Sequence, residues 1–397
     1  MISKNRGSLR IVISNIVLIS NAFIWYSFAF NVLKGMVDTL ILPWIIHFSA
    51  IIFSGIFGAM LSERIHKKET FLLFWIIFGV ICSLFLVFAD LTTVLVPSFL
   101  FGISFGLGVP ASLEYFAKST TFENRGKLGG LILCVNGVGI FLLSLVTAEN
   151  LALNAFILTT WRTFGLIAFL LVKFPQEIRT ISPVSFRRIL SQRIFFLYFI
   201  PWFMFSLVNY LSFPIQVNIL GSGTANSLCI IESFLASLFS IIGGCLSDAI
   251  GRKRVTIFGF IILGLGYAIL GIYPENIFSW YLYTVVDGVA WGIFYVIFVF
   301  TIWADISQSL CSEKYYALAG TSLFLSNFLR ISVGSYISQT FSPYAIFSFV
   351  ALFLFLAVIP LMYAPETLPE KLIRRRELRK YIEKAKKIRE KYEKEED

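Results

Sequence analysis

The sequence predicts an all-α membrane protein with twelve transmembrane helices, and three observations lead to this prediction: the composition, the length of the apolar segments and the placement of charge. The chain has 397 residues, of which 57% are hydrophobic and only 14% are charged. A soluble domain carries about 25% charged residues, so a soluble globular enzyme is excluded. Disordered and fibrous chains are also excluded, because such chains are much less hydrophobic.

Each predicted helix is an apolar segment long enough to cross a bilayer. A hydrocarbon core of ~30 Å requires roughly 20 residues at ~1.5 Å per residue. Twelve segments meet this requirement, and we place them at 11–33, 39–61, 70–89, 92–116, 128–148, 151–172, 194–218, 224–246, 255–273, 276–304, 315–338 and 343–363. Prolines within or beside them predict kinks, because neighbouring helices in a membrane satisfy the freed backbone groups.

Lysine and arginine predict which side of the membrane each loop faces. With the N-terminus inside, the segments assigned to the cytoplasm hold 30 of the 33 basic residues, and the outer loops hold only Lys34. Arg162 and Arg330 lie within predicted spans. Because cytoplasmic loops are enriched in basic residues, we expect both termini in the cytoplasm and a multi-pass protein of the cell (plasma) membrane.

A basic segment in the middle of the chain separates two predicted sets of six helices. It comprises residues 174–193, and it divides a bundle at 1–173 from a bundle at 194–364. Residues 365–397 form a charged tail whose apolar positions recur at helical spacing. We expect a solvated cytoplasmic helix in the tail, and the alternative is docking on anionic lipid headgroups or on a partner.

A short signature lies near the cytoplasmic end of the second helix in each set. In GCLSDAIGRKR the helix ends near Asp248, Gly251 permits a tight turn, and a basic run starting at Arg252 anchors the inner surface. The matching segment AMLSERIHKK has Glu63 in the place of Asp248. The two acids are 185 residues apart, close to half the chain, and this period is typical of secondary transporters built from parallel halves.

The signature resembles the cytoplasmic loop motif of the major facilitator superfamily, G-x-L-x-D-x-x-G-R-R/K-x. The matching residues are Gly244, Leu246, Asp248, Gly251, Arg252 and Lys253. The resemblance implies the major facilitator fold, in which two pseudo-symmetric six-helix bundles give alternating access to a central site. It also implies that the motif residues, with Glu63 as their N-terminal counterpart, gate the cytoplasmic side. The alternative is that Asp248 only caps and orients its own loop.

Other segments resemble the sugar and metabolite porter branch of this superfamily. FPQEIR after helix six and PETLP after helix twelve are similar to sugar-porter signatures, and FENRG, which contains the gating candidate Arg125, resembles their loop between helices four and five. Ser98 and Lys118 depart from that pattern. The central Gly-Pro of drug/proton antiporters is absent from NGVGIFLLSL. The resemblance implies a transporter of a small polar metabolite such as a sugar, and a multidrug exporter of the same fold is the alternative.

Five ionisable residues lie at membrane depth, where a charge costs about 2.5–3.5 kcal/mol on insertion scales. The helical rise places them about 12–16 Å below the outer surface, and they are Glu232, Asp287, Arg330, Arg162 and His47. Helix ten lines the cavity of the facilitator fold, so Asp287 is the strongest candidate for binding substrate or a proton. Glu232 and Arg330 are its candidate partners, and the alternative is a purely structural ion-pair network. We expect structural roles for Arg162 and His47.

Amide and aromatic side chains in the spans suit a neutral polar ligand, because amides bind hydroxyl groups without the cost of burying charge. The candidate substrate-binding residues are Asn31, Asn136, Asn209, Tyr210, Gln216, Trp291, Tyr295 and Asn327. For any one of the asparagines, the alternative is an interhelical hydrogen bond, which is a common use of asparagine in membrane bundles.

The sequence lacks the chemical features of several other classes of protein. Two histidines cannot form a metal centre without carboxylates, and neither HExxH nor a nucleotide-binding loop is present. We therefore expect no catalytic residue, metal or cofactor, no enzymatic activity and no nucleic-acid partner. A non-transporting receptor is a further alternative, although a receptor would be expected to carry a substantial soluble domain. We expect a monomer in the lipid bilayer that binds a small molecule and, in one hypothesis, protons.

The first helix bears on proton coupling. Phe28-Ala29-Phe30-Asn31 resembles a helix-one segment of sugar porters that ends in Asp in proton symporters and in Asn in uniporters. Asn31 has no titratable group, so protons are not carried at this position. Either the protein equilibrates its substrate without protons, or coupling has moved to Asp287 or Glu232. Burial without a cation favours the neutral form of a carboxyl group, and our hypothesis is coupling through Asp287.

The orientation can be tested with cysteines introduced singly into a variant that lacks the native ones. Labels near Asp90, Glu149 and Glu275 should react with an impermeant reagent in intact cells, because their loops are poor in basic residues. Labels near Gln176 and Lys253 should react only after permeabilisation. Labelling of residue 176 from outside would contradict the division into two sets of six helices.

Overall fold

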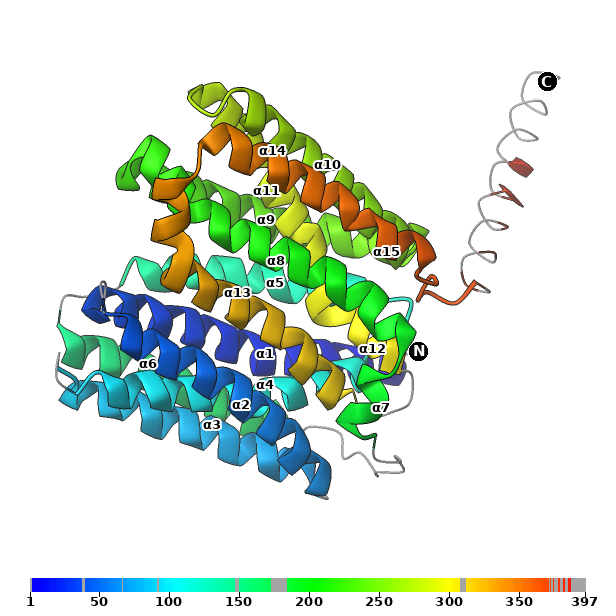
Figure 1. Ribbon diagram of the computed structural model, residues 1–397. Helices are drawn as coiled ribbons and strands as arrows, with labels where there is room; N and C mark the ends of the chain where they lie inside the picture. Colours follow the sequence, from blue (N-terminus) through cyan, green and yellow to red (C-terminus); the bar gives the residue numbers. More distant parts are fainter. Residues whose placement is uncertain are drawn as a thin grey trace, which may run out of the picture.

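The computed structural model describes residues 2–37, 40–65, 67–90, 93–146, 150–172, 184–307 and 312–370, with isolated positions as far as 386, and it describes side chains from Arg10 onward. Within these residues the protein is entirely helical (Figure 1). The first ten residues of the predicted linker lie outside the described residues. Most of the predicted tail does too, and the seven tail positions that are described beyond residue 370 are helical.

Each of the first six predicted spans is a helix. Their bounds are α1 (Ile2–Val37), α2 (Ile41–Arg64), α3 (Lys68–Leu84), α4 (Leu95–Ser119), α5 (Arg125–Ser144) and α6 (Leu151–Val172). A short 3-10 helix, η1 (Phe85–Phe88), extends α3, and a short helix, α7 (Phe186–Leu190), lies within the predicted linker.

The other six predicted spans are also helical, although two of them are divided. The bounds are α8 (Arg193–Leu220), α9 (Ser222–Ile250), α10 (Arg252–Ile272), α11 (Ile277–Phe294), α12 (Ile302–Ser307), α13 (Glu313–Thr340), α14 (Pro343–Leu356) and α15 (Val358–Tyr363). The π-helix η2 (Tyr295–Thr301) joins α11 to α12, so the tenth span runs from residue 277 to residue 307. Such wide turns are rare and frequently occur at functional sites.

Eleven of the helical spans are long and apolar enough to cross a membrane by composition alone. The remaining span is α13, which has 28 residues and is therefore long enough, but it carries Glu313, Lys314 and Arg330 together with many serines. A helix with these residues is less apolar than its neighbours because its polar side chains serve contacts inside the protein.

The half with α1–α6 places α1–α4 and α6 in the lower part of Figure 1, and the half with α8–α15 places α8–α11, α14 and α15 in the upper part. The helices α5 and α13 lie between these two groups. The two halves meet where α5 packs against α9 and where α2 packs against α13. Each contact joins the second membrane-spanning helix of one half to the fifth of the other half, so the two contacts are equivalent under exchange of the halves. Where α5 and α9 cross, the hydroxyl of Ser240 donates to the carbonyl oxygen of Gly130 at 2.9 Å.

Glycines allow close packing of α2 against α4. Gly102 and Gly106 lie one turn apart on α4, and a methyl group at either position would overlap atoms of α2. At Gly106 the overlap involves the carbonyl oxygen of Ile51 and the side chain of Ser54. Small residues at this spacing let membrane helices approach closely and gain van der Waals contact.

This packing predicts a difference between two glycine substitutions. Gly106→Ala should lower the unfolding temperature in detergent, because overpacking typically costs about 1–3 kcal/mol. Gly35→Ala is the matched control, since no atom lies within 4 Å of the added methyl group. Thermal unfolding of the two purified variants and the wild type measures the effect. Equal unfolding temperatures for both variants would contradict the close approach of α2 and α4.

Candidate substrate site and cytoplasmic gate

Asp248, near the end of α9 that is predicted to face the cytoplasm, holds the start of α5 in the other half of the chain. Its carboxylate oxygens accept the backbone N–H groups of Gly126 at 2.9 Å and Lys127 at 2.8 Å. Arg252 forms an ion pair with the same carboxylate at 2.8 Å. A helix N-terminus has unpaired N–H groups and attracts an anion. Asp248 therefore caps a helix of the opposite half as well as orienting its own turn.

Asp305 in α12 joins both halves of the chain at the same end. It forms ion pairs with Arg125 of α5 and, at 3.2 Å, with Arg252 of α10. Arg252 also donates to the carbonyl oxygen of Phe122 at 3.0 Å. The three charged side chains are buried, with no more than 5% of each residue exposed. The sequence analysis missed Asp305, because a single acid near the end of a span has no distinctive spacing.

The contact between α2 and α13 has its own group of charges. Glu63 pairs with Lys314 at 2.6 Å, and Lys68 pairs with Glu313 at 2.7 Å. Lys68 also pairs with Glu114 of α4. Glu63 thus contacts the opposite half near the second crossing of the halves, as Asp248 does near the first. The partners on α13 were also missed, although an adjacent acid and base at the start of a span is a signal that could have found them.

Two glycines of the signature occupy positions where no other residue fits easily. Gly251 has a φ of 112°, which is in the left-handed region that favours glycine. The carboxylate of Glu366, in the PETLP segment, lies against it and accepts the N–H groups of Arg252 at 2.8 Å and Lys253 at 3.1 Å. Gly244 faces the carbonyl oxygen of Gly126 with no room for a methyl group. The motif residues therefore build the closed contact between the halves at this end.

Asp287 lies in a buried hydrogen-bonded network among α8, α10 and α11. It is 2% exposed, and its Oδ2 accepts the hydroxyl of Tyr283 at 2.8 Å. The hydroxyls of Tyr283 and Tyr267 are 2.8 Å apart, and that of Tyr267 is 3.2 Å from Oδ1 of Asn209 and 2.9 Å from the hydroxyl of Ser212. The other oxygen of Asp287, Oδ1, is buried with no hydrogen-bond partner.

Glu232 and Arg330 are half-buried, and the predicted ion pairs with Asp287 are not found in the described part of the chain. The backbone of Glu232 lies against α11, since a methyl group at Gly288 would be 3.0 Å from its carbonyl oxygen. The guanidinium of Arg330 lies over the ring of Tyr210 instead, at 5.8 Å from the centroid. Among the described residues no ion pair joins Asp287, Glu232 and Arg330, so the structure does not contain the ion-pair network that was the alternative.

Three aromatic candidates form one cluster beside these charges. The ring centroids of Tyr210 and Trp291 are 6.1 Å apart, and those of Trp291 and Tyr295 are 4.7 Å apart. Trp291 is one turn from Asp287 on α11, and Tyr295 begins the π-helix. The cluster therefore extends from the buried carboxyl group of Asp287 to the guanidinium of Arg330.

The amide candidates have different surroundings. Asn136 is 4% exposed and neither polar atom of its side chain has a partner, and the Oδ1 of Asn327 is also buried and unpartnered. Asn209 belongs to the network behind Asp287, and Gln216 is buried near the outer end of α8. The prediction that Asn31 is a buried amide is wrong, because the helix α1 presents it on an exposed face.

The remaining charged candidates, His47 and Arg162, make contacts between helices. His47 has its Nδ1 2.9 Å from the carbonyl oxygen of Ser98 and its Nε2 3.2 Å from the hydroxyl of Tyr26. Arg162 donates to Oδ1 of Asn21 at 2.8 Å and packs over the ring of Trp75 at 4.5 Å.

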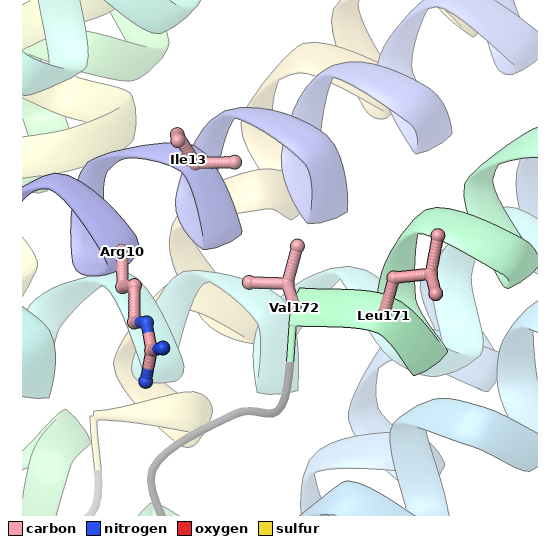
Figure 2. A pocket seen from close by; sticks show the side chains of 4 residues that line it. All are labelled: Arg10, Ile13, Leu171 and Val172. Atoms are coloured by element: carbon pink, nitrogen blue, oxygen red, sulfur yellow. The ribbon is translucent and has the colours of Figure 1, made fainter.

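A surface pocket lies between the start of α1 and the end of α6. Figure 2 shows its lining, which consists of Arg10, Ile13, Leu171 and Val172. Three of the four side chains are aliphatic, and no carboxylate or amide faces the pocket. None of the midspan polar residues contributes to it, so we assign no substrate site there.

Sequence comparison relates this chain to known transporters. The family model described as Major Facilitator Superfamily matches residues 194–391. Dipeptide and tripeptide permease A from Serratia proteamaculans is 30% identical over 133 residues, which is 32% of this chain and 24% of that permease. The match therefore spans about a quarter of the length of this curated relative.

Three solved structures share the fold at low identity. The proton:xylose symporter XylE has a TM-score of 0.65 at 15% identity, and the match covers 90% of this chain and 96% of that chain. The human organic anion transporter MFSD10 has a TM-score of 0.68 at 14% identity, with 89% and 99% of the two chains covered. The Escherichia coli fucose:proton symporter FucP has a TM-score of 0.67 at 12% identity, with 87% and 97% covered. At such identities the likeness concerns the fold alone. It confirms the predicted fold of two pseudo-symmetric six-helix bundles.

The contacts of Asp248 predict the effect of removing its charge. Asp248→Asn should reduce transport by roughly tenfold, because it weakens the bonds to the start of α5 and the ion pair with Arg252. Substrate affinity in detergent should change little, since the midspan residues are untouched.

Distances between spin labels at Lys67 and Arg254, which are both exposed at this end, should lengthen in Asp248→Asn. Glu123→Gln is the matched control, because Glu123 is exposed at the same end of the molecule. Loss of substrate binding with unchanged label distances would show that Asp248 does not act as a gate.

Proposed function

We propose that the chain is a transporter of the major facilitator superfamily, whose family model matches residues 194–391, and that it moves a small polar organic solute by alternating access, coupled to protons through Asp287. This proposal rests on a contrast between the charged residues at the predicted cytoplasmic end and those at midspan. At the predicted cytoplasmic end, buried charged residues of the two halves are paired with one another, as in Asp305 with Arg125. At midspan, Glu232 and Arg330 have no ion-pair partner among the described residues.

The paired end is suited to be a gate, and the unpaired centre is suited to bind a ligand. Burying a charge without a partner is costly, so such residues in a membrane protein mark substrate or ion pathways. The similar proteins transport xylose, fucose, organic anions or short peptides according to their names. Sugars and short peptides are therefore the first solutes to test.

Asp287 is the proposed proton carrier because of its surroundings. No basic side chain pairs with it in the described chain, and its Oδ1 is buried without a partner. An ionised carboxylate in such a place costs several kcal/mol more to bury than the neutral acid. The hydroxyl of Tyr283 orients the other oxygen, so the carboxyl group is held in place whether or not it carries a proton.

Uptake into proteoliposomes with and without an imposed pH gradient tests this coupling. Wild-type protein should accumulate solute only with the gradient, and Asp287→Asn should equilibrate it without accumulation. Glu275→Gln, which removes an exposed acid at the outer end, is the control. Accumulation that ignores the gradient in the wild type would leave a uniporter, and coupling that survives Asp287→Asn would move the proton to Glu232.

A further inference from the structure

We infer that the transported solute is a zwitterion, with its carboxylate bound by Arg330 and its ammonium group bound by Glu232. The inference rests on the proposed transport function and names the chemical class of solute for the same site. Amino acids and short peptides have this chemistry, whereas a neutral sugar does not. Two opposite charges border one aromatic cluster, and the described part of the chain neutralises neither of them.

Arg330 presents hydrogen-bond donors that the described chain leaves unused. Its guanidinium lies over the ring of Tyr210, at 5.8 Å, and over that of Phe213, at 5.5 Å, and within the described residues it forms no hydrogen bond or ion pair. Contact with aromatic faces leaves the N–H groups at the edge of a guanidinium available to a ligand. A planar fork of N–H groups in this state matches a carboxylate in two-point contact.

Glu232 is the complementary group on α9. Its side chain is half-buried at midspan, and in the described chain it has no hydrogen bond and no ion pair. Its oxygens differ from Oδ1 of Asp287, which is fully shielded. Glu232 is thus the acid that a ligand can reach, and Asp287 is the acid held behind it. An ammonium group is the natural partner of a reachable carboxylate in a low-dielectric site.

Both charges border one aromatic cluster. The guanidinium of Arg330 lies over the ring of Tyr210, whose centroid is 6.1 Å from that of Trp291. Trp291 is one turn from Gly288, and a methyl group at Gly288 would be 3.0 Å from the carbonyl oxygen of Glu232. If the site served a neutral solute, direct pairing of the two charges would lower the cost of their burial. They remain apart instead, and a solute with one charge of each sign satisfies both.

Binding of four related solutes to purified protein tests the inference. The probes are dialanine, dialanine amide, which lacks the carboxylate, N-acetyl-dialanine, which lacks the ammonium group, and xylose. Dialanine should bind to the wild type roughly 10- to 100-fold more tightly than either modified peptide, because each lacks one charge-assisted contact. Xylose should bind no more tightly than the modified peptides.

Two variants assign each charge. Arg330→Gln should lower the affinity for dialanine by roughly 10- to 100-fold and leave the weak affinity for dialanine amide unchanged. Glu232→Gln should lower the affinity for dialanine by the same factor and leave the affinity for N-acetyl-dialanine unchanged. Arg254→Gln and Glu275→Gln remove one exposed charge of each sign and serve as controls. Equal unfolding temperatures without ligand would show that the variants fold.

Tight binding of xylose with no preference for dialanine would overturn the zwitterion inference. The inference would also be overturned if the variants lowered the affinities for dialanine amide and N-acetyl-dialanine as much as the affinity for dialanine. In either case, uptake of a sugar or another solute into proteoliposomes would leave the transport function intact. Failure of folded wild-type protein to take up any of the four probes, or any solute in a wider screen, would instead overturn the proposed function itself.

Discussion

Lipid offers neither hydrogen bonds nor counter-ions, and the arrangement of this protein follows from how its buried charges meet that constraint. At one end of the bundle, Asp305 has an arginine from each half, Arg125 and Arg252. Asp248 satisfies the free N–H groups at the start of α5. Removing one member of such a group would leave a buried charge without a partner, which is strongly destabilising. The halves are therefore held together at this end by charge.

The same constraint applies to the charged residues predicted to lie at midspan. Glu232, Arg330 and Asp287 are predicted to lie at midspan, where a charge is most costly, and the described chain does not pair them with one another. A protein that only needed stability would pair or replace such residues. Their separation is consistent with a site whose missing partners come from a solute and a proton.

One helical stretch connects the site to the gate. Asp287 and Trp291 lie in α11, Tyr295 opens the π-helix, and Asp305 lies in α12 at the gate. Because the backbone is continuous through these elements, a change of conformation in the π-helix would move the gate carboxylate relative to the site. The connection between the halves at α5 with α9 relies on small residues that permit close contact, whereas the connection at α2 with α13 has the ion pair of Glu63 with Lys314.

The number of helices, their approximate limits and the family of the fold were predictable from the sequence. Hydropathy over about 20 residues depends only on local composition, and the signature from Gly244 to Arg252 is a local motif. The sequence also placed Asp287, Glu232 and Arg330 at one depth. The pairing of these charges that the sequence suggested was wrong. Pairing depends on which sides of two helices are turned toward one another, and the depth of a residue in the membrane does not determine this. Asp305, Glu313 and Lys314 find their partners in the other half only in the tertiary structure. Asn31 was expected to be buried, yet lies on an exposed face of α1, since burial is decided by the neighbours that the tertiary structure supplies.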